Sequence, residues 1–389
     1  MTAPLVKGWC PGAWRPMPSG DGLLVRIRPR GGRLSREQAA GITRLADWHG
    51  NGMIELSTRG NIQLRGVTPA THAPLVTGLA ALGLIDPTPE AEGLRNIVTT
   101  PFWQGGDGTV ELTARLENAL LDGPTPDLPA KFGFAVDTGT RPVLRDVSAD
   151  IRLERDPSGA LLCRADGTSS GARVTPETAI PVALELARWF AASGGHGRMQ
   201  ACLQAGAALP AIFTGVDAAP RCTQPGPVPG PSAAGFMIGL PFGQMRARTL
   251  FALANIAPLR VTPWRMLLLE GQAGAPDLDD IITHAEDPLL RVVACPGLPD
   301  CAQAHQPTRP LARALAPHVP KGRVLHVSGC AKGCAQPQRA WLSLVAQAHG
   351  FGLVRNGNAK AAPIAPLLPV ERILASPTML MENPDALSV

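Results

Sequence analysis

The sequence predicts an α+β protein in which one order of elements occurs twice. A strand, a helix and two short strands are expected at 23–28, 36–49, 53–57 and 61–65, and the same order returns at 235–240, 245–256, 259–262 and 266–269. The chain has 389 residues, 45% of them hydrophobic, which is enough for more than one packed core. We therefore predict an internal duplication around a pseudo-two-fold axis. Two unrelated α+β lobes are the alternative.

The helix of the first copy is predicted from its two ends. Ser35 is a favourable N-cap, and Gln38 stands three residues later, as in a capping box. Ile42 and Leu45 supply an apolar stripe. The Gly-Asn-Gly turn at 50–52 then ends the helix and leads into the next strand.

Each copy is followed by matching segments. The strands expected there are 94–99 and 132–136 in the first copy and 290–295 and 323–327 in the second. The first copy also contains a hairpin at 149–164. A helix is expected after it at 176–192, with Thr175 as its cap and Pro176 at its first position.

A proline-rich segment separates the two copies. Residues 220–231 contain five prolines and two glycines in twelve positions. Proline lacks the N–H that helices and sheets need, so we expect this segment to pair in no sheet and to continue no helix. It is predicted to be an exposed connection.

Composition excludes several classes of function. Charged residues make up 17% and the net charge is +5, so nucleic-acid binding is not expected. The chain has no tyrosine, which rules out a tyrosyl radical. The first 18 residues lack the apolar core of a signal peptide, and no apolar run is long enough to span a membrane. A cytoplasmic location is therefore expected, where disulfides are rare.

Four of the eight cysteines lie within 40 residues, in two pairs with spacings of five and three intervening residues. They are Cys295, Cys301, Cys330 and Cys334. Four thiolates on two loops are the ligands that a [4Fe–4S] cluster needs, and the glycines and prolines beside them favour loops. A structural zinc site is the alternative, although the five-residue gap fits its usual spacing poorly. Free thiols are a further alternative.

These cysteines and three other segments together resemble the nitrite and sulfite reductase superfamily. In that superfamily the four cysteines hold a [4Fe–4S] cluster and the last lies beside a tetrapyrrole. The segments that resemble its tetrapyrrole-carboxylate motifs are Ser57-Thr58-Arg59-Gly60-Asn61-Ile62-Gln63, Arg95-Asn96 and Leu128-Pro129-Ala130-Lys131-Phe132. The resemblance covers about residues 20–345 in the same order.

The N-terminal segment resembles one branch of this superfamily, the precorrin-3B synthase family of aerobic cobalamin biosynthesis. The residues that carry this resemblance are Gly8-Trp9-Cys10-Pro11-Gly12 and the run from Arg15 through Gly20-Asp21-Gly22 to Arg26. The resemblance implies dioxygen-dependent hydroxylation of precorrin-3A at C20 with γ-lactone formation. It also implies a [4Fe–4S] cluster and electrons derived from NADH.

The resemblance further implies a nitrite/sulfite reductase-like fold with two ferredoxin-like half-domains and two α/β lobes. The expected domains are an N-terminal segment with the first half-domain at 1–75, the first lobe at 85–219, the linker at 220–232, the second half-domain at 233–275 and the cluster-binding lobe at 285–389.

The site residues follow from the same motifs. Tetrapyrrole carboxylates need fixed cations, and arginine binds carboxylates in two-point geometry. The expected substrate-binding residues are Arg26, Arg28, Arg59, Gln63, Arg95, Asn96 and Lys131, and the expected catalytic residues are Arg59, Lys131 and Cys334. Cys295, Cys301, Cys330 and Cys334 are the expected metal ligands. Lys332, Arg291 and Arg323 are the cations expected to influence the cluster potential.

The electron donor is expected to be a separate reductase. The chain contains no G-x-G-x-x-G segment after a strand, so NADH is not expected to bind it directly. The site of dioxygen activation is left open between the cluster and a mononuclear iron, for which His196 and His326 are conceivable ligands or simply structural histidines. Siroheme binding is also left open.

Two other functions compete with this hypothesis. A siroheme-dependent sulfite or nitrite reductase would need a second lysine where Gly133 stands, because a small oxyanion requires that positive charge. A non-catalytic electron-transfer module would not need the basic tetrapyrrole motifs.

Overall fold

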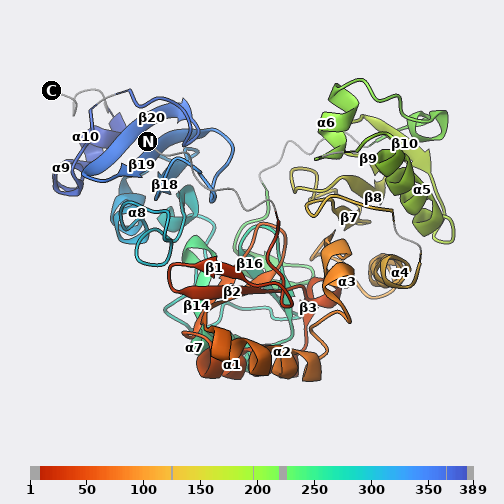
Figure 1. Ribbon diagram of the computed structural model, residues 1–389, viewed down its shortest axis with the longest axis horizontal. Coiled ribbons are helices and arrows are strands. Elements are labelled where there is room, and N and C mark those ends of the chain that lie inside the picture. The colour runs from red at the N-terminus through yellow and green to blue at the C-terminus, as the bar shows by residue number, and fades with distance from the viewer. Residues whose placement is uncertain (1–8, 124–125, 196, 219–225, 365, 383–389) are drawn as a thin grey trace.

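The computed structural model describes residues 9–123, 126–195, 197–218, 226–364 and 366–382. Within these residues the strands form four sheets. Two sheets lie at the centre of the molecule with helices below them, and the other two belong to lobes that lie on either side (Figure 1).

The two central sheets have equivalent strand orders. The first contains β1 (Met17–Ser19), β2 (Gly22–Ile27), β5 (Ile62–Val67), β4 (Met53–Leu56) and β14 (Gln244–Arg246), in that order. The second contains β12 (Gly230–Ser232), β13 (Gly235–Gly239), β16 (Met266–Glu270), β15 (Leu259–Val261) and β3 (Arg33–Leu34). Three helices lie along the lower side of these sheets, namely α1 (Arg36–His49), α2 (Pro69–Ala81) and α7 (Ala247–Ile256) (Figure 1).

Each copy gives one strand to the sheet of the other. β14 of the second copy pairs antiparallel with β4, and β3 of the first copy pairs antiparallel with β15. The chain reaches both strands through a kinked single turn, where Gly31 has φ 56° and Phe242 has φ 57°. The two half-domains therefore cannot separate without breaking sheet hydrogen bonds.

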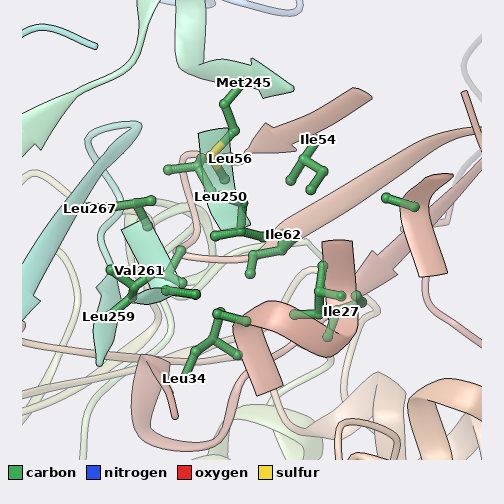
Figure 2. Close-up of a cluster of buried hydrophobic side chains, with 14 of the residues drawn as sticks. Ile27, Leu34, Ile54, Leu56, Ile62, Met245, Leu250, Leu259, Val261 and Leu267 are labelled. Carbon is green, nitrogen blue, oxygen red and sulfur yellow. The ribbon is translucent and has the colours of Figure 1, made fainter. Parts of the chain in front are cut away.

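One hydrophobic core serves both half-domains. Side chains from β2, β4 and β5 pack with side chains from α7, β15 and β16. Figure 2 shows Ile27, Ile54 and Ile62 of the first copy facing Leu250, Leu259 and Leu267 of the second. Because all six are at most 1% exposed, the packing energy of each half depends on the other.

The two lobes repeat a second pattern. Their strands are β6 (Ile97–Thr99), β7 (Phe134–Asp137), β8 (Ile151–Arg155) and β9 (Leu161–Ala165) in one, and β17 (Val292–Ala294), β18 (Leu325–Ser328), β19 (Ala340–Gln347) and β20 (Gly350–Gly357) in the other. In both lobes the first three strands are parallel and the fourth is antiparallel. The first lobe continues into β10 (Ser170–Arg173) and β11 (Val216–Asp217).

Each lobe also contains α-helices. They are α3 (Pro89–Leu94), α4 (Thr109–Asp122), α5 (Ala179–Ala192) and α6 (Met199–Gln204) in the first lobe, and α8 (Arg309–Leu315), α9 (Val370–Ala375) and α10 (Pro377–Glu382) in the second. None of the helices in the described residues combines the length and the apolar character that crossing a bilayer requires.

The predicted α+β fold with its duplicated order is confirmed, and so is the capping box, in which Ser35 and Gln38 bond reciprocally. Two helix starts were predicted too early. The helix expected from 245 begins at Ala247 because 244–246 pair with β4. The helix expected from 176 begins at Ala179, after a turn in which the Thr178 N–H donates to the Thr175 hydroxyl.

The expectation that 220–231 pairs in no sheet was wrong at its end. Pro231 lies in β12 and pairs with Phe236 of β13. β12 is the edge strand of its sheet, where a proline removes no ladder hydrogen bond on its open side. Residues 220–225 lie outside the described residues.

We predict that the two halves unfold together. Leu250→Ala in α7 should lower the free energy of unfolding by about 2–5 kcal/mol, the usual effect of truncating a fully buried leucine. Urea unfolding followed by circular dichroism should show one transition. Trp48→Ala, at a 69% exposed position of α1, is the control and should change stability by no more than about 0.5 kcal/mol. Two separate transitions would contradict the shared core.

Candidate functional site

The four clustered cysteines lie on two loops that leave neighbouring parallel strands. Cys295 and Cys301 follow β17, and Cys330 and Cys334 follow β18. The carboxyl ends of parallel strands meet at one edge of a sheet, so the two loops lie side by side. A backbone hydrogen bond from His305 N to Gly329 O, 2.8 Å long, connects them.

Two glycines let these loops approach closely. The N–H of Gly329 donates to the Sγ of Cys295 at 3.0 Å. A Cβ at Gly329 would lie 2.8 Å from the Cβ of Ala304 and 3.3 Å from the Cys295 sulfur. Gly297 has φ 70°, and a side chain there would meet the Thr308 backbone at 2.7 Å. A larger residue at either position would push the loops apart.

The thiols act on one another. Burial raises the pKa of Cys295, which is then lowered by the backbone N–H groups of Gly329 and Gly297 and raised by Cys301 and Cys330. Burial also raises the pKa of Cys334, which Lys332 lowers and the other three cysteines raise. All four side chains therefore lie in one electrostatic neighbourhood.

Two adjacent loops with four cysteines are compatible with the ligand set of an iron–sulfur cluster. Within the described residues, no three His, Cys, Asp or Glu side chains lie close enough together to hold one metal ion. A four-iron cluster places each thiolate on a different iron, so its ligands are neighbours without touching. N–H donors to thiolate sulfur, as at Cys295, are typical of iron–sulfur sites.

A buried arginine ties the first half-domain to the cysteine loop. Arg65 of β5 is ion-paired with Asp21 at 2.6 Å and with Glu55 at 3.3 Å. Its Nη2 also donates to the carbonyl of Asp300 at 2.7 Å, and the hydroxyl of Ser19 donates to the same carbonyl at 2.8 Å. The β1–β2 hairpin therefore holds the residue immediately before Cys301.

The contact is made close by a glycine in the hairpin. Gly20 N donates to the Asp300 carbonyl at 3.1 Å, and a Cβ at Gly20 would lie 2.3 Å from the Pro299 carbonyl. On the other side, Arg309 of α8 donates to Glu55 at 2.6 Å. The lobe with the cysteines is thus joined to the first half-domain through a network of buried charges.

Arg59 lies on a tight turn between β4 and β5. The Ser57 hydroxyl accepts from the N–H groups of Arg59 and Asn61 at 3.3 and 3.2 Å, which fixes the turn. The guanidinium donates to the Lys131 carbonyl at 3.3 Å. Burial lowers the pKa of Arg59, and Cys10 and Arg198 lie close enough to affect it as well.

Arg26 and Gln63 face each other across β2 and β5. Gln63 Oε1 accepts from Arg26 Nη2 at 2.7 Å and from Nε at 3.2 Å. Burial and the neighbouring Arg28 lower the pKa of Arg26 to about 10, while the Cys10 side chain, which hydrogen-bonds to it, raises it. Arg26, Arg59 and Cys10 therefore form one partly buried group with an excess of positive charge.

Arg28 and Arg95 have acidic partners inside the protein. Arg95 is 4% exposed and donates to both carboxylate oxygens of Asp86, at 2.8 and 2.9 Å, and to the Arg28 carbonyl at 2.8 Å. Arg28 lies 3.3 Å from Glu92, which also accepts from the Ala13 N–H. The structure thus brings Arg95 into the interior rather than onto an open face.

Asn96 and Lys131 lie beside the Arg59 turn. Arg59 and Asn96 line a small cavity together with Gly133. Lys131 is exposed, and its carbonyl accepts from Arg59. The N–H of Gly133 donates to Asp150 at 2.9 Å, and a Cβ at Gly133 would lie 3.0 Å from the Asn96 carbonyl. A long cationic side chain could not be added at Gly133 without moving this backbone.

A curated precorrin-3B synthase from Sinorhizobium sp is 30% identical to this chain, and the alignment covers 93% of this chain and 86% of that protein. The chain belongs to the precorrin-3B synthase family. Membership supports an enzymatic role in cobalamin biosynthesis.

The other comparisons find similarity to nitrite and sulfite reductases and to a protein of the same fold. Residues 15–82 match the nitrite/sulfite reductase ferredoxin-like half domain. The structure of the Mycobacterium tuberculosis NirA protein matches 93% of this chain and 80% of its own with a TM-score of 0.61 and 16% identity, which shows a common fold. A ferredoxin–nitrite reductase of Synechococcus elongatus is 30% identical over 138 residues, only 32% of this chain and 26% of that protein.

Sequence reasoning missed three residues of this region of the precorrin-3B synthase fold. Cys10 stands in the N-terminal motif but is not among the expected site residues, and it lies against Arg26. Glu55 connects Arg65 to Arg309. Arg265 lies near Cys295, and only an alignment of the two copies would have identified it. His196 and Cys222 lie outside the described residues.

We predict that Arg65 is needed for cluster loading. Arg65→Met leaves Asp21 without its cation and Glu55 with Arg309 alone, and should destabilise the fold by about 3–5 kcal/mol, as expected for breaking a buried ion pair. Iron per chain after anaerobic purification should fall. Arg248→Met breaks an exposed pair with Asp280 and is the control, with an expected effect below about 1 kcal/mol. Equal effects of the two variants would contradict this role.

Proposed function

We propose that this chain catalyses the dioxygen-dependent hydroxylation of precorrin-3A at C20, forming the γ-lactone of precorrin-3B. One oxygen atom enters the substrate and the other leaves as water. The reaction uses two electrons and two protons, with NADH as the ultimate electron source. The observation that carries this proposal is the relationship to the precorrin-3B synthase family along nearly the whole chain.

In this proposal Cys295, Cys301, Cys330 and Cys334 would hold a [4Fe–4S] cluster, which would supply electrons one at a time. The chain's own contribution is to keep the four thiols on two tightly packed loops and to donate the Gly329 N–H to the Cys295 sulfur. Cys334 is the exposed member of the four, which is consistent with a position on the substrate side.

The carboxylates of precorrin-3A are proposed to bind the group around the β4–β5 turn. Arg59, Lys131 and Asn96 lie together at this turn, and Arg26 with Gln63 lies on the adjoining strands. Arg59 is the principal candidate because the Ser57 turn fixes its backbone. Its side chain is also half-buried, so that water screens its charge only partly.

Arg28 and Arg95 are proposed to act indirectly. Asp86 accepts two hydrogen bonds from Arg95, and Glu92 lies 3.3 Å from Arg28, so a substrate carboxylate would compete with a buried carboxylate at either arginine. Arg28 instead braces the N-terminal segment through Glu92, which accepts from Ala13 N at 2.7 Å, and Arg95 supports Arg28 by donating to its carbonyl at 2.8 Å.

Reduction of sulfite or nitrite is the less favoured function. The second oxyanion-binding lysine of the reductases is absent at Gly133, and the close Asn96 carbonyl leaves little room for a replacement side chain. Siroheme is therefore not required by the proposal. Electrons are proposed to come from a separate NADH-dependent reductase, and a mononuclear iron is left as a further cofactor whose ligands the described residues do not identify.

The central experiment uses anaerobically purified protein with precorrin-3A, a chemical or enzymatic electron source and ¹⁸O₂. The expected result is a product heavier by one labelled oxygen atom. Formation of this product only with dioxygen supports the proposal. Absence of that product together with reduction of sulfite or nitrite would overturn it.

We predict that Arg59→Met lowers kcat/KM for precorrin-3A by about 10- to 100-fold, because a hydrogen bond to a charged group contributes about 1.5–3 kcal/mol. The cluster content should stay unchanged. Arg44→Met, at an exposed position of α1, is the matched control and should have normal kinetics. A normal kcat/KM for the Arg59 variant would exclude this residue from substrate binding.

We also predict that Cys330→Ser abolishes the broad visible absorption of the purified protein, because serine is a poor ligand for iron–sulfide. Cys163→Ser removes a buried thiol far from these loops in sequence, in β9, and should retain the absorption. Retained absorption in the Cys330 variant would contradict the ligand set.

A further inference from the structure

The turn that carries Arg59 has an equivalent in the second copy. Thr262 Oγ1 accepts from the N–H groups of Trp264 and Met266, both at 3.3 Å, as Ser57 does in the first copy. Strand pairing sets Leu56 opposite Ile62 and Val261 opposite Leu267. This register places Arg265 at the position of Gly60.

The two equivalent residues have the same left-handed backbone but different side chains. Gly60 has φ 65° and Arg265 has φ 60°. Glycine adopts this conformation freely, whereas a residue with a Cβ is strained there. Strain of this kind is retained where the side chain has a task, so the arginine itself requires an explanation.

The Arg265 side chain extends beneath the second cysteine loop. Its Nη2 donates to the carbonyl of Ala335 at 3.0 Å, the residue that follows Cys334. Burial lowers the pKa of Arg265, and Glu55, Arg309 and Cys295 are near enough to affect it. The guanidinium therefore lies between the buried charge network and the cysteines.

His326 lies beside this arginine under the same loop. It is fully buried, and neither ring nitrogen has a hydrogen-bond partner among the described residues. His326 pairs with Val293, two residues before Cys295, so alternation along the strands directs His326 and Cys295 to the same face of the sheet. A Cβ on Gly333 would lie 3.8 Å from the imidazole Cε1, so no side chain separates loop and ring.

The imidazole is neutral in this position. Burial and the neighbouring Arg265 lower the pKa of His326 to about 4. A neutral imidazole carries one N–H donor, and a buried donor without an acceptor is unfavourable. The Cys295 thiolate, and the sulfide of a cluster held by the four cysteines, would be acceptors on this face of the sheet.

We propose that Arg265 and His326 raise the reduction potential of the iron–sulfur cluster. Arg265 holds the Cys334 loop and places a cation beside it. His326 donates its N–H toward the sulfur atoms that the cluster would bring to this face. This proposal rests on the four-cysteine cluster of the proposed function. Reduction adds negative charge to a cluster, so a nearby cation and an N–H donor stabilise the reduced form and raise its potential.

Arg265→Gly tests the arginine without harming the backbone, because glycine is the residue found at the equivalent position 60. The variant should be at least as stable as the parent in urea. The ratio of reduced to oxidised cluster at a fixed potential should fall about tenfold, equivalent to ~59 mV for a one-electron couple. Arg248→Gln removes one exposed positive charge, and its potential should be unchanged.

His326→Leu removes the N–H donor but still fills the buried space with a side chain. His326→Gln restores an N–H donor. The potential, measured by redox titration with electron paramagnetic resonance, should fall in the leucine variant and recover at least partly in the glutamine variant. A merely structural role of His326 would give equal potentials in both. Loss of the cluster from folded Arg265→Gly protein supports the loop-holding role.

The outcomes separate this inference from the proposed function. Full cluster content with potentials unchanged in Arg265→Gly and His326→Leu overturns the inference and leaves the hydroxylation proposal intact. Parent protein that binds no four-iron cluster when reconstituted anaerobically with iron and sulfide overturns both. If the parent protein binds a four-iron cluster whose potential changes in these variants but does not convert precorrin-3A, only the proposed function is overturned.

Discussion

The exchange of strands between the two half-domains is the constraint on which the rest of the structure depends. β14 completes the first sheet and β3 completes the second, so the two sheets and the helices below them share one core. The cysteine loop is joined to this core by hydrogen bonds from Gly20, Ser19 and Arg65 to the Asp300 carbonyl.

Each copy contacts the opposite lobe through the arginine of a buried ion pair. The acidic and the basic residue of this pair have exchanged strands between the two copies. Glu55 in β4 pairs with Arg65 in β5, whereas the equivalent strands β15 and β16 carry Arg260 and Glu270, 2.8 Å apart. Arg65 donates to the Asp300 carbonyl of the cysteine loop, and Arg260 donates to the carbonyls of Pro101 and Trp103 in the first lobe. Each copy thus grips the loop after the first strand of the opposite lobe.

Local signals made the elements and the two cysteine-bearing loops predictable, whereas the long-range pairings could not be predicted. The capping box at Ser35 and the repeated element order lie within short stretches of sequence, and so do the cysteine pairs. The burial of Arg95 depends on Asp86 and Glu117, and the role of Arg65 depends on Asp300, 235 positions away. The sequence contains these arginines but does not show whether a carboxylate of the protein already pairs with the guanidinium group. The left-handed backbone of Arg265 is seen only in the structure, and its equivalence to Gly60 follows from the strand register of the two copies.

The exchanged strands also constrain how this architecture arose. A single half standing alone would have an open edge at β4 and an unpaired donor strand, a combination that a second identical half satisfies under two-fold symmetry. The ancestral form implied by this geometry is a homodimer with two identical sites. Fusion of two such genes would make the association intramolecular and independent of concentration. It would also end the requirement that both halves stay alike, which is compatible with the basic group lying in one copy and the four clustered cysteines in the other.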